Sequence, residues 1–243
     1  MNTSNPCSIP VHCIAETEDF AVIWKPPRMH CAPVRQSSGS TLLEWYASHN
    51  PAMMELSGRK KGEGGLLHRL DFETQGLVLC AKNQPALDNL LDQQKQGNFI
   101  KEYSAVCHAP CNHAVIESFF QPFGPGRKMV RAVTVDCKNK KHIASDQGGY
   151  YRTEVIDGTA LNNHFLHTLR LKRGFRHQIR CHLAWIGCPV VNDPLYGTGT
   201  IDGFLGLCAT GLFFNDPSTG KPAEYHIESP YKNLPLEMPP EMP

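Results

Sequence analysis

The sequence predicts an α+β fold in which strands and helices are mixed. Apolar runs and alternating segments indicate strands, while leucines at i, i+3 and i+4 indicate helices. The two kinds of segment do not follow each other in the regular β-α order that predicts a doubly wound parallel sheet. With 243 residues, 41% of them hydrophobic, the chain can bury the core of one large domain or of one domain made of two lobes.

Four elements are expected in the first hundred residues. Residues 20–24 form an apolar run that two prolines end, as expected of a strand. Residues 41–49 begin with a threonine and a glutamate at capping-box spacing and continue with apolar residues, which indicates a helix. Residues 77–81 form a continuous apolar run typical of a buried strand. Residues 85–96 begin with a proline, which is tolerated in the first turn of a helix, and Leu87, Leu90 and Leu91 have helical spacing.

The second half of the chain predicts further strands and one helix. Residues 101–107 alternate and indicate a strand. Residues 150–173 predict two strands around a turn at Asp157-Gly158 and Asn162-Asn163. Residues 177–186 have helical spacing and are followed by glycine and proline. The tail, about residues 216–243, is rich in proline, so we expect it to be mostly irregular.

Composition excludes several classes of protein. The 24 basic and 23 acidic residues give a net charge of +1, which excludes a histone-like cationic protein. The longest uncharged run, residues 203–215, is too short and too rich in glycine for a membrane helix. The N-terminus lacks the basic and apolar regions of a signal peptide, so we expect a cytoplasmic protein without membrane contact. We expect the 10 scattered cysteines to be reduced thiols.

One group of cysteines and histidines could offer ligands to zinc. It consists of Cys107, His108, Cys111 and His113. The spacing is not that of a standard zinc knuckle, and no second pair lies at a typical distance. We therefore expect a loop after a strand here, and no metal site.

Residues 68–77 read His-Arg-Leu-Asp-Phe-Glu-Thr-Gln-Gly-Leu, a polar loop that leads directly into a buried strand. This position puts Asp71 at the edge of the core, where an unpaired carboxylate is unfavourable. Asp71 could serve chemistry there, or it could be a turn residue that binds its own backbone.

Residues 170–182 contain five Lys or Arg residues and no acid. Basic side chains around a glycine turn and a helix start can form a phosphate-binding surface. The alternative is a basic face that only contacts solvent.

These segments together resemble the signatures of the RluA-type pseudouridine synthases. Residues 68–77 resemble HRLDxxTSGL, and residues 174–197 resemble GRxHQIRxHLxxxGxPIxGDxxYG. The strand that begins at Lys101 fits the KxYxAxV region, and residues 24–27 match the NKPxG element more loosely. The matches keep the family's order over roughly residues 20–200. Departures that bear on substrate positioning are Gln75, Phe175, Asn192 and Arg28, which stand where the family usually has Ser, Arg, Gly and Gly.

The resemblance implies an isomerase that detaches uracil from ribose, rotates it and rejoins it through carbon 5. Asp71 matches the family's catalytic aspartate, and Arg180 matches the arginine that pairs with it. Tyr103 matches the tyrosine that stacks on the base and is a candidate general base. The sequence leaves open which atom the carboxylate acts on. The reaction needs no redox step, metal or other cofactor, so none is expected.

The resemblance also implies a structured RNA, ribosomal or transfer, from which the target uridine is flipped out. Arg69 is expected to fill the vacated stack, and Leu183 or Val190 to form an apolar floor under the base. The other residues expected to bind RNA or the base are His68, Thr74, Arg176, His177 and Gln178. Basic segments expected to give affinity are residues 59–61, 127–131, 138–141 and 170–180.

The fold implied is a mixed, mostly antiparallel central sheet flanked by helices, with two lobes and an active-site cleft between them. We expect residues 1–243 to form a single catalytic domain without an S4 domain, its motif-bearing core covering about residues 18–200. No obligate protein partner is evident, and a monomer is expected. A net charge of +1 is compatible with RNA binding if the surface is polarised, with a basic cleft around Asp71 and Arg180.

Three other functions compete with this hypothesis. A hydrolase would pair Asp71 with a second carboxylate, such as Glu73 or Asp193. A non-catalytic RNA-binding module would keep the fold alone. A metal-dependent enzyme would use His177, Cys181 and His182.

Overall fold

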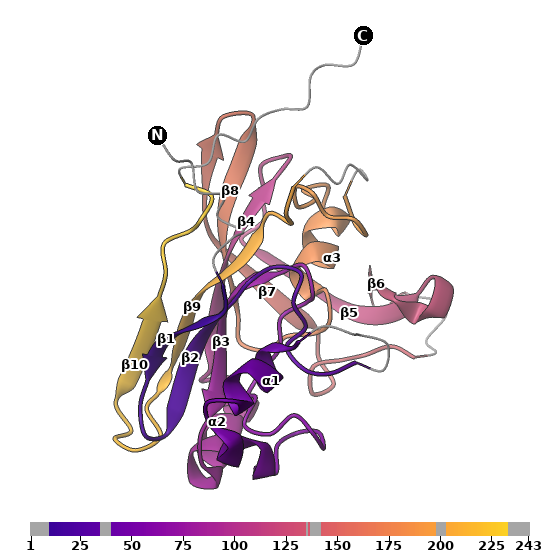
Figure 1. Cartoon of the computed structure of the whole chain (residues 1–243). Coiled ribbons are helices and arrows are strands. Elements are labelled where there is room, and N and C mark those ends of the chain that lie inside the picture. Colours follow the sequence, from indigo (N-terminus) through magenta and orange to yellow (C-terminus); the bar gives the residue numbers. More distant parts are fainter. Residues whose placement is uncertain (1–9, 35–39, 135, 137–141, 198–202, 233–243) are drawn as a thin grey trace, which may run out of the picture. The chain divides into compact units, whose positions relative to one another are not determined.

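The computed structural model describes residues 10–34, 40–134, 136, 142–197 and 203–232 (Figure 1). They fall into two compact units, the first made of Met1–Lys101 with Ala209–Ile227 and the second of Glu102–Cys208 with Glu228–Pro243. The chain leaves the first unit within β4 (Ile100–Cys107) and returns to it within β9 (Leu207–Asn215).

The first unit is built on an antiparallel sheet. β1 (His12–Glu16) pairs with β2 (Phe20–Lys25), and β2 pairs with β3 (Gln75–Ala81), both antiparallel. β9 is the next strand after β3, and β10 (Pro222–His226) pairs antiparallel with β9. Every residue of β2 and β3 is buried, as the apolar runs predict.

The two expected helices of this unit are confirmed. α1 (Leu42–Ala47) begins with the capping box, in which the Thr41 hydroxyl accepts the Glu44 N–H at 3.2 Å and the Glu44 carboxylate accepts the Thr41 N–H at 2.8 Å. A short 3-10 helix, η2 (Pro51–Glu55), follows. α2 (Gln84–Gln96) begins at Asn83, whose side chain accepts the Ala86 N–H at 2.9 Å.

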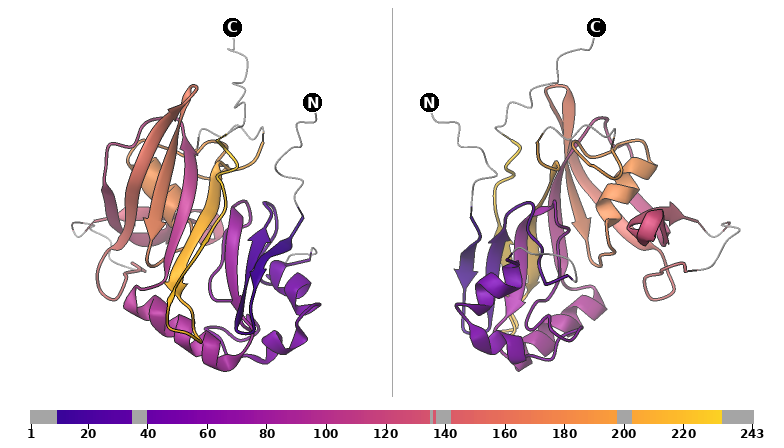
Figure 2. Two further views of the ribbon diagram at one scale, coloured as in Figure 1. Left: turned by 90° about the vertical axis from the view of Figure 1, so that its left-hand side faces the viewer. Right: turned by 45° about the vertical axis from the view of Figure 1, so that its right-hand side comes forward.

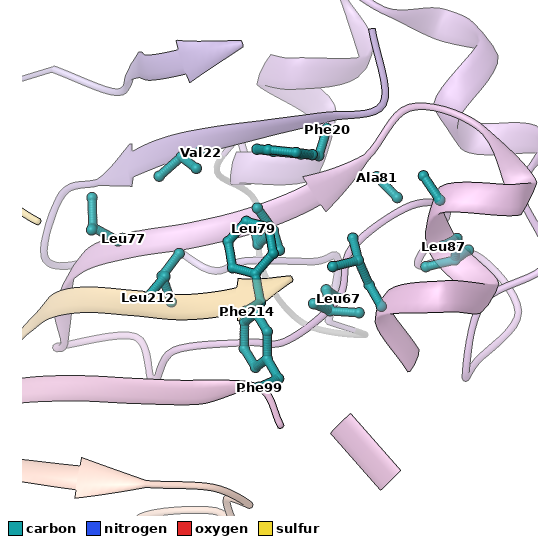
Figure 3. Close-up of a cluster of buried hydrophobic side chains, with 12 residues drawn as sticks. Phe20, Val22, Leu67, Leu77, Leu79, Ala81, Leu87, Phe99, Leu212 and Phe214 are labelled. Carbon is teal, nitrogen blue, oxygen red and sulfur yellow. The ribbon is translucent and has the colours of Figure 1, made fainter. Parts of the chain in front are cut away.

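A single apolar core joins the sheet of the first unit to α2 (Figure 3). Leu77 and Leu79 of β3 pack with Phe20 of β2 and with residues of α2 and β9. Leu67 belongs to the same core, and its N–H donates to the Leu79 carbonyl at 3.0 Å. The segment that leads to Asp71 is therefore anchored on β3.

The second unit contains the strand order β4-β8-β7-β5-β6 and one helix. Its other strands are β5 (Val115–Phe123), β6 (Met129–Val133), β7 (Tyr151–Leu161) and β8 (His164–Leu171), with the 3-10 helix η3 (Pro125–Arg127) between β5 and β6. The pairs β5–β6, β5–β7 and β7–β8 are antiparallel. α3 (Gln178–Trp185) packs against β5, β6 and β7 (Figure 2), where Cys181 joins Phe120 and Val130 in a small core.

The α+β prediction and the mostly antiparallel sheet are confirmed, but one predicted turn is wrong and the mostly irregular tail contains one strand. The turn lies at Asn162-Asn163 alone, where Asn162 has a φ of 52°. Asp157-Gly158 lies inside β7, where the two residues pair with Thr168 and His167 of β8 directly after a bulge between Val155 and Asp157. The strand within the tail is β10, which forms because it pairs antiparallel with β9.

No helix among the described residues is long and apolar enough to cross a membrane. The eight cysteines that the structure describes are free thiols.

Candidate active site

Asp71 lies in a tight turn directly before β3. The Asp71 carbonyl accepts the Thr74 N–H at 3.2 Å, which closes the turn. Two residues later, Gly76 has a φ of 123° and runs so close to Ala209 of β9 that a Cβ atom would clash with the Ala209 backbone. The motif glycine is therefore needed for the packing of β3 on β9, and this packing fixes where the Asp71 turn begins.

Two side chains hold the backbone on either side of Asp71. The Lys25 ammonium donates to the Phe72 carbonyl at 3.3 Å. The Leu70 N–H donates to the Cys31 sulfur at 3.2 Å, and the Cys31 thiol donates to the Leu70 carbonyl at 3.5 Å. Both side chains are buried. The remaining two hydrogen bonds of the ammonium go to the carbonyls of Pro26 and Met29, at 2.9 and 2.8 Å.

The Lys25 ammonium is a buried cation beside the Asp71 turn. Burial lowers the pKa of Lys25 to about 8, although Cys31, Asp71 and Glu73 act in the opposite direction. The ammonium therefore interacts electrostatically with both carboxylates of the turn. Three hydrogen bonds to carbonyls use all three of its N–H donors.

His68, the first residue of the motif, is bonded to β3. Its Nε2 atom accepts the Leu79 N–H at 3.2 Å, and its ring centroid lies 5.6 Å from that of Phe99. Burial, and after it the charges of Lys101 and Arg59, holds the pKa of His68 well below its usual range. The ring is therefore neutral, with its proton on Nδ1, an atom that has no hydrogen-bond partner among the described residues.

Arg69 and Thr74 have different surroundings. The Arg69 side chain is 50% exposed and forms an ion pair with Glu63 at 3.0 Å. Thr74 is buried, and its hydroxyl has no hydrogen-bond partner within the described part of the chain. The Arg69 side chain is thus accessible to a ligand, whereas the Thr74 side chain is buried at the end of the turn.

In the second unit, Arg180 forms a fully buried ion pair with Asp193. The guanidinium donates from Nε and from a terminal nitrogen to the two carboxylate oxygens, both at 2.8 Å. The same carboxylate accepts the N–H groups of Leu195 and Tyr196 at 2.9 and 3.1 Å. Asp193 therefore holds the Arg180 side chain in one orientation.

The start of α3 is fixed by its own motif residues. His177 has a φ of 56°, in the left-handed region, and its Nδ1 lies 3.1 Å from the Tyr196 hydroxyl. The Gln178 amide accepts the Phe175 N–H at 2.9 Å and donates to β7 at 3.0 and 3.1 Å. The exposed Arg176 donates to the Arg127 carbonyl at 2.7 Å. Leu183 is fully buried.

The three expected catalytic residues belong to different units. Asp71 lies in the first unit, while Tyr103, 6% exposed on β4, and Arg180 lie in the second. The pairing of Arg180 with Asp71, the action of Tyr103 and the basic cleft stay predictions.

The basic segment 170–180 is not the uniformly solvated cationic face that its composition suggests. Arg170 pairs with Glu102 at 2.9 Å, and Arg173 pairs with Asp146 at 2.8 Å. Together with the Arg180–Asp193 pair, three basic residues of segment 170–180 form ion pairs with acids from other parts of the same unit. A count of charges along the sequence cannot show these pairs. Lys172 and Arg176 are exposed. Residues 138–141 of the expected basic surface lie outside the described residues.

The residues of the metal hypothesis have other partners. The His182 nitrogens lie 2.9 Å from the Ser118 hydroxyl and 2.8 Å from that of Thr153, and burial lowers the pKa of His182 to about 3. The Cys181 thiol donates to the Val130 carbonyl at 3.4 Å. Among the described residues, no group of three His, Cys, Asp or Glu side chains could hold a metal ion. Cys107 ends β4 and a loop follows, as expected.

Lys25 and Cys31 were missed as functional candidates, and Asp193 was considered only as the second carboxylate of a hydrolase. Lys25 is the charged end of an apolar strand, and Asp193 occurs in the second motif, so both carried a signal. Cys31 carried none, because its contact with Leu70 joins residues that lie 39 positions apart.

The fold and its motif-bearing loops define an α+β enzyme of the RNA-modifying class. The model of the RNA pseudouridylate synthase family matches residues 19–185, and the chain belongs to this family. Its members isomerise uridine in RNA to pseudouridine, so the protein is an isomerase.

Relatives agree with this assignment. The chain is 29% identical over 219 residues to the uncharacterized RNA pseudouridine synthase YlyB of Bacillus subtilis, covering 88% of this chain and 68% of the relative. It is 28% identical over 246 residues to ribosomal large subunit pseudouridine synthase D of Escherichia coli K12, covering 93% and 69%. In fold it is similar to human RNA pseudouridylate synthase domain containing 1, with a TM-score of 0.67 and 21% identity over 91% of this chain and 84% of that one.

Proposed function

We propose that the protein converts one specific uridine of a structured RNA to pseudouridine, with Asp71 as the catalytic carboxylate. The observation that carries this proposal is that hydrogen bonds hold the backbone on both sides of Asp71. Lys25 donates to the Phe72 carbonyl, and the Cys31 thiol bonds to the N–H and the carbonyl of Leu70. A carboxylate that must meet one atom of a bound nucleoside benefits from a backbone that is already held in place. A turn residue with a purely local role would not need these contacts.

The reaction requires four changes at the nucleoside. The bond between ribose carbon 1′ and uracil nitrogen 1 breaks, the base rotates, a bond from carbon 1′ to carbon 5 forms, and the carbon 5 proton leaves while nitrogen 1 takes up a proton. Asp71 serves the first step, by attack or by assisting proton removal from the sugar. Tyr103 stacks on the base and accepts the carbon 5 proton, and Arg180 is the cation that partners Asp71.

The substrate of the proposed reaction is a structured RNA. The Escherichia coli relative is named for the large ribosomal subunit, so ribosomal RNA is the first substrate to test, with transfer RNA as the second. The target uridine leaves its helix, and Arg69, exposed beside the Asp71 turn, fills the vacated stack. The enzyme acts as a cytoplasmic monomer on this RNA, and the whole chain serves as one catalytic domain.

The test uses RNA from cells that lack the protein, labelled with tritium at uracil carbon 5. Formation of pseudouridine releases that tritium to water, and digestion of the RNA then yields pseudouridine. We expect both products with the wild-type protein, neither with Asp71→Asn, and wild-type levels with Asp92→Asn, the same chemical change on the exposed face of α2. Free uracil in place of pseudouridine would instead support the two-carboxylate hydrolase, and no product in any RNA fraction would contradict the proposal.

A further inference from the structure

An aromatic pair, of which the Phe72 ring is exposed and the His30 ring partly exposed, lies next to Asp71 in the first unit. Phe72 directly follows Asp71, and its side chain is 39% exposed. Its ring centroid lies 4.6 Å from that of His30, with 38° between the ring planes. We propose that Phe72 and His30 form a stacking platform for a nucleobase that flanks the target uridine, an inference that rests on the proposed function.

Phe72 differs from the other exposed apolar side chains of its unit. In the described part of the first unit, the remaining large apolar residues at the surface are Ile14, Val34 and Met54, none of them aromatic. Single aliphatic residues at a surface are ordinary and need no ligand. An exposed ring that already contacts a second ring offers a flat apolar surface, which is what the face of a nucleobase requires.

The platform is held in place from both sides by backbone contacts. The Lys25 ammonium donates to the Phe72 carbonyl and also to the carbonyl of Met29, the neighbour of His30. The His30 carbonyl accepts the Leu42 N–H at 2.9 Å, which fixes it to the start of α1. The backbone segments that carry both rings are therefore already held in place, so they lose little conformational freedom when a base binds.

The position of Phe72 determines which nucleotide it can contact. The target uridine must reach the carboxylate of Asp71, and Phe72 is the next residue of the same turn. A base on the Phe72 ring is therefore a neighbour of the target and not the target itself. Because every base has a π face, the platform adds affinity for any base and orients the strand without reading its hydrogen-bonding edge.

The experiment compares four variants in single-turnover pseudouridine formation on RNA from cells that lack the protein. Each reaction is run over a series of enzyme concentrations, which separates the half-saturating concentration from the maximal rate. For Phe72→Ala we expect the half-saturating concentration to rise about 5- to 150-fold, the range for loss of one base–aromatic stack, with the maximal rate retained. We expect a smaller rise of the half-saturating concentration for His30→Ala and a value near wild type for Phe72→Tyr. Met54→Ala should leave the half-saturating concentration unchanged.

A second arm identifies the stacked nucleotide. Once the modified position is mapped, synthetic RNA segments carry an abasic site at one flanking position at a time. At the stacked position, we expect the difference between wild type and Phe72→Ala to disappear, because the partner of the ring is gone. A difference that persists at every abasic position would overturn the platform, as would an unchanged half-saturating concentration or a loss confined to the maximal rate.

These outcomes are distinct from a failure of the proposed function. If the wild-type protein forms no pseudouridine, the proposed function fails and the platform fails with it. If the wild-type protein is active and the two Phe72 variants match it in both parameters, the platform alone is wrong.

Discussion

The Cys31 thiol and the Leu70 backbone are bonded to each other in both directions. The Leu70 N–H donates to the sulfur at 3.2 Å, and the thiol donates to the Leu70 carbonyl at 3.5 Å. Burial raises the pKa of Cys31, so the group stays a thiol that can both donate and accept. The Cys31 side chain thus forms hydrogen bonds with both the N–H and the carbonyl of Leu70, the residue that precedes Asp71.

Cys31→Ala removes both hydrogen bonds and leaves a small cavity. We expect the free energy of unfolding to fall by about 1–3 kcal/mol and kcat to fall about 10- to 100-fold, because the Asp71 turn loses its fixed position. The affinity for RNA stays near wild type. Cys31→Ser keeps a donor and an acceptor and recovers part of kcat. Urea unfolding, single-turnover rates and RNA binding check this, and equal kcat values for Cys31→Ala and wild type would show that the thiol does not position Asp71.

Lys25 predicts a pH dependence of the rate. Its pKa of about 8 means that the ammonium loses a proton, and one of its three N–H donors, as the pH rises above 8. We expect kcat to decrease over this range while RNA stays bound. Lys25→Met lacks the group, so its lower kcat does not change through pH 8. A wild-type rate that stays flat from pH 7 to pH 9, with the protein folded throughout, would argue against this role.

The Arg180–Asp193 pair predicts a large effect on stability. Both side chains are fully buried, so Asp193→Asn removes the negative charge of this pair while the guanidinium stays in the interior. Breaking such a pair costs about 3–5 kcal/mol. Urea denaturation of Asp193→Asn and of the exposed control Asp92→Asn measures the difference. A loss of less than 1 kcal/mol in Asp193→Asn would mean that the pair does not hold α3 in place.

His182 predicts how stability changes with acid. The pKa of His182 is about 3 in the folded protein and 6.5 ordinarily, because burial disfavours the charged ring. Between these values the unfolded chain binds a proton that the folded chain does not, so stability falls as the pH falls from 6.5. The contribution is about 1.4 kcal/mol for each pH unit. Unfolding of His182→Gln at pH 7 and pH 5 should show a smaller decrease than wild type, and parallel decreases would contradict the assignment.

Local signals in the sequence predicted the elements that depend on local contacts. Thr41 and Glu44 predicted the start of α1, since a capping box is complete within four residues. Elements that depend on a partner strand were harder to predict. β10 alternates Ala223 and Tyr225 with exposed residues, but this pattern is too short to be recognised in a proline-rich segment without its partner β9. Asp157-Gly158 does not turn because both residues pair with β8, next to a bulge.

The same distinction applies to the candidate site. The motif residues could be found because they are close together along the chain. The contacts of Lys25 with Phe72 and of Cys31 with Leu70 join positions 47 and 39 residues apart, and no spacing rule reports them. The acids that pair with Arg170 and Arg173 were missed for the same reason, so the charge of residues 170–180 was overestimated.

The central claim is that Asp71 is the catalytic carboxylate of an RNA pseudouridine synthase. The most direct measurement is a map of pseudouridine at single-nucleotide resolution in RNA from cells that lack the protein and are supplied with either the wild type or Asp71→Asn. Equal protein levels and equal RNA binding confirm that the variant is folded. We expect the wild type to restore one pseudouridine that Asp71→Asn does not restore. Restoration of the same site to the wild-type level by Asp71→Asn would contradict the claim.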